Sequence, residues 1–345
     1  MRALVTGATG AIGPATVRTL LTSGAVVRAF GRLDRFRDQP DRRPDWPAEV
    51  ELADGDVTRP ETVAAAMPGV DVVIHLAALL HVVNPPPGHD RLYRSINVDG
   101  TRAVAEAAAA AGVRRLVLAS TTAVYGPTGE QPASEDTAPA PDSWYAESKL
   151  EAERAARAVG RQTGLDIVIL RLSAVYGPRV RGNYRRLLGA MARGRFVSIG
   201  PGHNRRSLVA DEDAARAFEL AARHPAAAGQ TFNVADGPAH TVEEILAAMS
   251  AAVGRPQPRW HLPKGLARVV AAAGDIAGSA VGRRPGLRPS VEKYLEESAV
   301  DASRICDVLG FQPELDLTAG WRMTAERLRA SGELPPLDGA ALVRT

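Results

Sequence analysis

Short apolar runs alternate with alanine-rich helical patterns through the first half of the chain. Residues 3–5, 70–76 and 116–119 are almost continuously apolar, which is typical of strands buried on both faces of a parallel sheet. Segments with the helical spacing of apolar residues, such as 14–23 and 102–111, separate these runs. The pattern therefore predicts an α/β fold built on a doubly wound parallel sheet, with a ligand site at the carboxyl ends of the strands.

This alternation ends near residue 178. We expect residues 1–177 to form the sheet domain and residues 178–333 to form mainly a smaller C-terminal lobe that binds substrate, with some segments returning to the sheet. Residues 334–345 are expected to form a tail. The apolar segment 262–281 predicts an amphipathic helix that closes the lobe, or else a wall for an apolar substrate.

Composition indicates an ordinary globular protein. The 345 residues are 45% hydrophobic and 23% charged, and no apolar run approaches the ~18 residues of a membrane-spanning helix. The first strand leaves no room for a signal peptide, and the single cysteine fits a reducing compartment, so we expect a cytoplasmic protein. The net charge of +3 comes from dispersed arginines. We therefore expect neither a nucleic-acid nor a membrane partner, and no metal site is predicted.

A glycine-rich turn follows the first strand and opens the first helix. Gly7 permits a tight turn, Gly10 lets the backbone approach a pyrophosphate, and Gly13 allows the helix to pack closely on the strand. The phosphates would meet the positive end of the helix dipole. This context predicts a Rossmann-type dinucleotide site. Its first cofactor-binding residues are Gly7, Thr9, Gly10, Ala11, Ile12 and Gly13.

The end of the second apolar strand bears on the choice of dinucleotide. An acidic residue there would bond the ribose hydroxyls of NAD, but the chain has Gly31 at that place and Arg32 after it. A guanidinium at this point can pair with an adenosine 2′-phosphate. Arg32 therefore favours NADP over NAD, with a surface arginine as the other interpretation.

Tyr145 and Lys149 lie four residues apart in a helical pattern, so both side chains project from one helix face. A free tyrosine, with a pKa near ~10, is a poor base at neutral pH. A neighbouring ammonium and a positive nicotinamide ring would both favour the phenolate. The pair is predicted to move the proton during oxidation or reduction of a substrate. A hydroxyl at the end of the preceding strand, in residues 120–122, would bond the reacting oxygen.

Together these motifs resemble the extended short-chain dehydrogenases, also called the NAD-dependent epimerase/dehydratase family. The glycine turn, Asp56-Val57, residues 75–78, residues 97–101, residues 119–126 and Tyr-x-x-x-Lys occur in that family's order. The resemblance implies Thr121, Tyr145 and Lys149 as catalytic residues. It also implies further contacts to the dinucleotide, from Asp56, Val57, Leu76, Ala77, Ala78, Asn97, Ser120, Tyr145 and Lys149. His75 is interpreted as structural.

The second half is similar to nucleotide-sugar enzymes of that family. Asn183 matches an asparagine near the pyrophosphate, and Arg206 matches an arginine that binds the diphosphate. The implied substrate-binding residues are Thr121, Thr122, Tyr145, Asn183 and Arg206. Leu172 departs from the family's usual proline. Thr122 and Ala123 stand where 4,6-dehydratases carry an acidic pair, which argues against dehydration.

Three functions remain open. The first is redox at a secondary alcohol or ketone carbon of a nucleotide sugar, as 4-epimerisation or as keto-sugar reduction. The second is an NADPH-dependent reductase or dehydrogenase of an apolar alcohol or ketone, as in the sterol and flavonoid branches. The third is a non-catalytic NADP-binding regulator. The resemblance also implies a possible homodimer formed by helices of the first domain.

Overall fold

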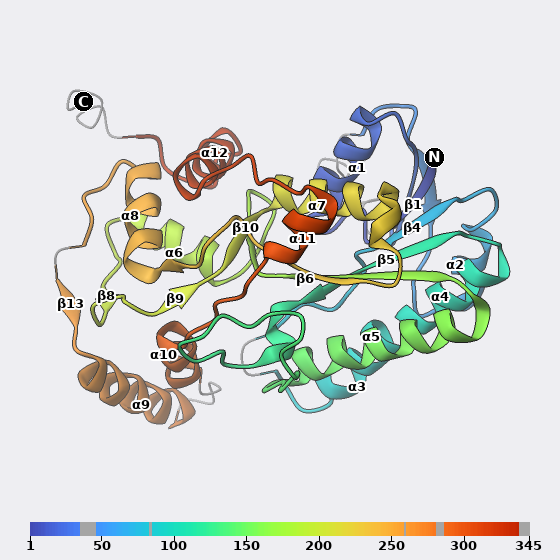
Figure 1. The fold of residues 1–345 in the computed structure, drawn as a ribbon. Helices are drawn as coiled ribbons and strands as arrows, with labels where there is room; N and C mark the ends of the chain where they lie inside the picture. The colour runs from blue at the N-terminus through green and yellow to red at the C-terminus, as the bar shows by residue number, and fades with distance from the viewer. Residues whose placement is uncertain (35–45, 83–84, 259, 281–285, 338–345) are drawn as a thin grey trace.

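The centre of the protein is a seven-stranded sheet in which all neighbouring strands are parallel. The computed structural model describes residues 1–34, 46–82, 85–258, 260–280 and 286–337 (Figure 1). The strand order is β11-β6-β5-β4-β1-β2-β3. These strands are β1 (Arg2–Thr6), β2 (Val26–Gly31), β3 (Glu51–Asp54), β4 (Val72–His75), β5 (Arg115–Thr121), β6 (Asp166–Leu172) and β11 (Thr231–Val234). The order changes direction between β1 and β4, which confirms the predicted doubly wound α/β fold.

Helices cover both faces of the sheet (Figure 1). On one face lie α1 (Gly13–Thr22), α7 (Asp211–Arg223) and α11 (Ser303–Leu309). On the other face lie α2 (Pro60–Ala65), α4 (Gly100–Ala110) and α5 (Trp144–Thr163). The apolar runs of the inner strands are buried from both sides because each face of the sheet has its own helical layer.

The second half of the chain contributes to both parts of the molecule. β11 extends the sheet beside β6, and α7 packs on the sheet face. A separate core joins α6 (Asn183–Ala192), α8 (Val242–Ala252) and α12 (Leu317–Ala330). The division expected near residue 177 stays a prediction, while β11 and α7 show that segments of the second half lie in or on the sheet. Of the expected tail 334–345, residues 338–345 lie outside the described part.

Short strand pairs and a helical hairpin complete the smaller lobe. The pairs are β7 (Ala174–Tyr176) with β10 (Leu208–Ala210), β8 (Ser198–Ile199) with β13 (His261–Leu262), and β9 (Arg205–Arg206) with β12 (His240–Thr241). The hairpin consists of α9 (Lys264–Ala280) and α10 (Leu287–Leu295), at the end of the molecule far from β2 and β3 (Figure 1). None of the helices in the described ranges is long and apolar enough to cross a bilayer.

Three short helical segments connect the larger elements of the sheet domain. α3 (His89–Tyr93) runs directly into a π-helical segment (Arg94–Asp99), which continues into α4. A 3₁₀ turn (Thr122–Tyr125) follows β5, and another (Pro225–Ala227) precedes β11. The π-helical segment is a point of interest because such segments are rare and often occur at functional sites.

Candidate active site

The carboxyl ends of β1, β4 and β5 open into a cavity of about 1360 Å³. Gly7 has a φ of +67°, and a Cβ built on it would lie 2.6 Å from the Ala77 nitrogen. A Cβ on Gly13 would collide with the Ala8 carbonyl oxygen. The first and third glycines are thus required by the close approach of backbone segments, as the sequence predicted.

Most of the predicted dinucleotide residues line this cavity. They are Gly7, Thr9, Gly10, Ala11, Ile12, Arg32, Asp56, Val57, Leu76, Ala77, Ala78, Ser120, Tyr145 and Lys149. Gly13 and Asn97, also predicted to bind the cofactor, are buried outside the cavity lining. The elongated set of backbone and small side chains, leading from the glycine turn to Tyr145, fits a dinucleotide.

Arg32 lies at the adenosine end of the cavity and is 63% exposed. Its Nε stands 3.9 Å from Oδ2 of Asp56. A second carboxylate, that of Asp54, accepts a hydrogen bond of 2.6 Å from the Leu33 backbone N–H. The carboxylate of Asp56 beside the arginine offsets part of its charge, so the surroundings favour a 2′-phosphate less than the sequence alone suggested.

Tyr145 lies in the first turn of α5. Ser143 caps this helix, its Oγ accepting a hydrogen bond of 3.3 Å from the Ala146 N–H. The Tyr145 hydroxyl is hydrogen-bonded to Thr121, the last residue of β5, as expected for a pair that shares the reacting oxygen. Burial raises the pKa of Tyr145 to about 12, partly offset by the Thr121 hydrogen bond. In the chain alone this residue is therefore a phenol, and the expectation that the Lys149 ammonium and a nicotinamide ring together favour the phenolate stays a prediction.

Lys149 is 3% exposed and lies one helical turn after Tyr145. Burial lowers the pKa of Lys149 to about 8, and the negative charge of Glu153 acts in the opposite direction. A buried ammonium is costly unless a counter-charge lies near. Glu153, one further turn along the same helix face, supplies that charge.

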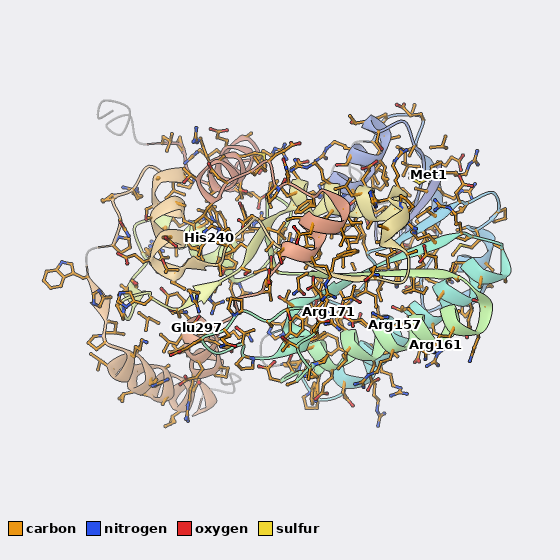
Figure 2. The ribbon with its side chains drawn as sticks, in the orientation of Figure 1. Met1, Arg157, Arg161, Arg171, His240 and Glu297 are labelled. Atoms are coloured by element: carbon orange, nitrogen blue, oxygen red, sulfur yellow. The ribbon has the colours of Figure 1, made fainter. Side chains whose placement is uncertain are left out.

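The carboxylate of Glu153 belongs to a buried network that the sequence did not reveal. Arg171 of β6 donates two hydrogen bonds to it, of 3.0 and 2.7 Å, and Ser120 donates a third. Arg171 also donates to the Tyr125 hydroxyl at 2.9 Å, which in turn donates to Asn233 at 2.8 Å. Figure 2 shows Arg171 near the middle of the molecule. The network fixes α5, and hence its catalytic turn, against β5, β6 and β11.

Asn97 lies in the π-helical segment and is fully buried. Its side chain bonds both backbone groups of Leu79, at 2.7 and 3.1 Å, and donates to the Ser148 Oγ at 2.9 Å. Ser148 in turn donates to the Tyr145 carbonyl oxygen at 2.8 Å. The extra residue of the π-helical turn thus aims Asn97 at the catalytic helix and a cavity loop, a positioning role in place of the predicted cofactor contact.

His75 confirms its structural interpretation. Its ring nitrogens lie 2.7 Å from the Thr6 hydroxyl and 3.0 Å from the Thr101 hydroxyl. Burial, with the charge of Lys149, lowers the pKa of His75 to about 3. A neutral, doubly hydrogen-bonded imidazole joins β1, β4 and α4 without taking part in proton transfer.

A second cavity of about 420 Å³ adjoins the first and is walled by the smaller lobe. Asn183, at the first turn of α6, lines both cavities. Arg206 lines the second cavity only in part, because its guanidinium donates to the Lys293 and Glu296 carbonyl oxygens at the end of α10. Thr122, predicted to touch substrate, does not line either cavity.

His81 was not predicted and lies where the two cavities meet. Its ring centroid is 5.9 Å from that of Tyr145, in an edge-on arrangement. Burial and the charge of Lys293 lower its pKa, while Asp142 raises it. It follows the predicted segment 75–78 by three residues, but a single histidine in a loop carries no spacing signal that would have identified it.

Known proteins with similar sequences and structures agree with the fold described above. A family model described as the NAD dependent epimerase/dehydratase family matches residues 3–235. The UDP-glucose 4-epimerase of Mycolicibacterium smegmatis is 32% identical over 345 residues, covering 95% of this chain and 99% of that one. A solved structure of MoeE5 in complex with UDP-glucuronic acid and NAD is 29% identical, with a TM-score of 0.74, covering 96% and 100% of the two chains.

A relative with another substrate is also similar. The 3 beta-hydroxysteroid dehydrogenase/Delta 5-->4-isomerase of Mycobacterium tuberculosis (strain ATCC 25618 / H37Rv) is 29% identical over 273 residues. The match covers 76% of this chain and 72% of that protein. Similarity at this level therefore extends over relatives whose printed substrates are chemically very different.

Proposed function

The chain belongs to the NAD dependent epimerase/dehydratase family, and within this family of enzymes we propose that it is a nucleotide-sugar 4-epimerase. One observation carries the proposal: Thr121, Tyr145 and Lys149 line the dinucleotide-shaped cavity, and the Tyr145 ring lies 5.9 Å, centroid to centroid, from His81, which lines both that cavity and the second cavity of the smaller lobe. The second cavity is lined by Arg181, Arg185, Arg206 and Lys293, a set suited to a diphosphate. The similar proteins that bind or act on UDP-sugars support this assignment.

In the proposed reaction Tyr145 accepts the proton of the C4 hydroxyl during oxidation and returns it during reduction. Thr121 holds the reacting oxygen beside Tyr145, and the Lys149 ammonium stabilises the phenolate that takes part in each half-reaction. A bound dinucleotide would supply the hydride acceptor for the oxidation at C4 and the hydride donor for the reduction. Net redox would be zero because the same hydride is returned to C4, and the configuration at C4 would invert because the keto sugar turns over in the cavity between the two steps.

The proposed cofactor is NAD. Arg32 was the observation that favoured NADP, and its position beside Asp56 weakens that argument. The similar solved structure contains NAD, which supports the same choice. A resident NAD also suits an epimerase, which regenerates its cofactor in each turnover.

An apolar alcohol or ketone is the second candidate substrate. Val175, Leu188, Ile245 and Leu246 line the second cavity beside its cationic residues. The similarity to a hydroxysteroid dehydrogenase is consistent with this alternative. In that case turnover would consume or produce reduced dinucleotide with each cycle.

The test is an assay of purified protein with UDP-glucose and with UDP-glucuronic acid, with no added reductant. We expect conversion of at least one of them to its C4 epimer, and greater thermal stabilisation by UDP with NAD than by NAD alone. Arg206→Ala should raise KM, and Tyr145→Phe serves as the inactive control. Stabilisation by dinucleotide but not by any nucleoside diphosphate would contradict the proposal and favour the apolar substrate.

A further inference from the structure

Helix α9 presents its apolar stripe to solvent. Leu266, Val269, Val270 and Ile276 follow one another at helical spacing, and their side chains are 51–73% exposed. The opposite stripe of the same helix consists of small residues, of which Ala267 and Ala271 are buried. An amphipathic helix in a globular protein ordinarily turns its large apolar residues inward, so this orientation is the reverse of the usual one.

The packing of α9 on α10 explains how the hairpin keeps this orientation. A Cβ on Gly274 would lie 2.6 Å from Cδ1 of Leu287, so the glycine lets the helices approach closely. The Asp275 carboxylate accepts hydrogen bonds of 2.7, 2.9 and 3.0 Å from the N–H groups of Gly286, Leu287 and Arg288. Small residues and this carboxylate hold the two helices together, which leaves the large apolar stripe unburied.

Two further exposed apolar residues precede the strand pair β8 and β13, of which β13 leads into α9. Trp260, 88% exposed, precedes β13, and Val197, 63% exposed, precedes β8, which pairs with β13. Fourteen large hydrophobic side chains are exposed in the described part of the chain. Seven of them lie in this region: the four of the stripe, Trp260, Val197 and Leu287 of α10. We call the following set the α9 surface: Val197, Trp260, Leu266, Val269, Val270 and Ile276.

Charge distinguishes this region from the rest of the molecule. Residues 261–295 contain six lysines and arginines and two acidic residues, a net charge of +4, whereas the whole chain carries +3. One of the two acidic residues, Glu292, is paired with Arg268, with contacts of 2.8 and 2.9 Å. An exposed apolar stripe and a neighbouring tryptophan, within a stretch of sequence of net positive charge, are properties of segments that lie in the headgroup layer of a bilayer.

We propose that the α9 surface docks on an anionic lipid bilayer and makes the protein a peripheral membrane protein. The sequence led us to expect no membrane partner, because no segment can span a bilayer, but docking in the headgroup layer needs no spanning segment. The stripe would enter the layer between headgroups and acyl chains, and the exposed Lys264 and Arg288 would meet lipid phosphates. A second copy of the chain fits less well, because a twofold contact would bring two hairpins of net charge +4 together.

The position of the hairpin connects docking to the substrate cavity. Ser290, Lys293 and Tyr294 of α10 line the second cavity, and α9 packs on α10 (Figure 1). A bilayer on the α9 surface would therefore lie one helix away from the substrate cavity. The proposal rests on exposure and charge alone, and it holds whichever substrate the enzyme takes.

The test measures co-sedimentation of the full chain with vesicles of phosphatidylcholine, with and without phosphatidylglycerol. We expect binding to the anionic vesicles, weaker binding in high salt, and little binding to phosphatidylcholine alone. Val269→Glu should lower the partition coefficient by about tenfold or more, because it removes an apolar group that would enter the bilayer and adds a negative charge there. Val308→Glu is the matched control, since Val308 is 38% exposed on α11, away from the hairpin.

The following outcomes decide the proposal, with an unchanged midpoint of thermal unfolding as the check that both variants are folded. Loss of vesicle binding in Val269→Glu with retention in Val308→Glu supports docking. Absence of vesicle binding by the unmodified chain, or equal loss in both variants, overturns it. A dimer in analytical ultracentrifugation that Val269→Glu makes monomeric, without vesicle binding, would assign the surface to a second copy and also overturn the proposal.

Discussion

Helices α5 and α9 are both long and amphipathic, and they place their side chains in opposite ways. α5 spans 20 residues and buries the polar groups Ser148, Lys149 and Glu153 together with its alanines. α9 spans 17 residues and exposes Val269 and Ile276 while burying alanines. Both helices thus depart from the rule that polar residues lie outside and apolar residues inside. α5 does so by burying polar groups, and α9 by exposing apolar ones.

The difference shows where each helix gives up stability for a function. Burying Lys149 and Glu153 costs desolvation. The hydrogen bonds that Glu153 accepts from Arg171 and Ser120, and its negative charge near Lys149, offset part of this cost. Exposing the α9 surface forgoes the favourable burial of its apolar area. Buried charge therefore indicates chemistry at α5, and exposed apolar area indicates a partner at α9. The predictions below test each half of this comparison.

The largest effect is expected at Tyr145. Replacing it with Phe removes the proton carrier and should lower kcat by about 10³-fold, within the 10²–10⁴-fold range of general acid–base catalysis. Dinucleotide binding, measured by thermal shift, should persist. Tyr93→Phe is the control, because Tyr93 is buried 6.1 Å away, centroid to centroid, and lies outside both cavities. A rate near that of the unmodified enzyme in Tyr145→Phe would remove this residue from the mechanism.

The next effect concerns the charge pair of α5. Glu153→Gln keeps the shape of the side chain but leaves Arg171 buried without a counter-charge, which should lower the free energy of unfolding by about 3 kcal/mol. Urea denaturation measures this change in the free energy of unfolding. Glu151→Gln is the control on the exposed side of the same helix, where Glu151 is 46% exposed and 3.6 Å from Arg94. We expect a change within about 0.5 kcal/mol for the control. Equal effects would show that the buried network contributes no more than a surface pair.

The placement of Tyr145 and Lys149 could be predicted because its geometry is local. Four residues of helix place Tyr145 and Lys149 on one face, and the strand end that carries Thr121 follows from the alternation of apolar runs. The glycine turn was predictable for the same reason. The doubly wound order followed from general rules of α/β connection once the strands were located.

The remaining features depend on contacts between distant segments. Glu153 and Arg171 lie 18 residues apart on a helix and a strand, and no spacing rule joins them. The role of Asn97 depends on a π-helical turn, which sequence periodicity does not distinguish from an α-helix. The pattern of 262–281 correctly indicated an amphipathic helix. It could not indicate that the apolar side faces solvent, because periodicity gives the separation of the two faces and not their direction.

Lys149 tests whether α5 gives up stability for catalysis. Burial lowers its pKa in the folded chain from the ordinary 10.5 to about 8, so below pH 8 both states are protonated and the folded state bears the cost of a buried ammonium. Between pH 8 and about 10.4 the folded state releases the proton first, and stability should rise. Lys149→Met should therefore abolish turnover and raise the free energy of unfolding at pH 7 by up to about 3 kcal/mol. The gain should shrink as pH rises to about 10. A loss of stability at pH 7 would show that the ammonium is stabilising where it lies.

The smallest effect is expected on the α9 surface. Ile276 is 73% exposed, so Ile276→Val should change the free energy of unfolding by less than about 0.5 kcal/mol. The same substitution at Ile305, which is fully buried in α11, should cost about 1 kcal/mol because it removes a methylene from a packed core. Parallel urea denaturation of the two variants gives the comparison directly. Equal costs would mean that Ile276 is buried in solution, as it would be in a dimer, and α9 would then follow the same burial rule as the rest of the core.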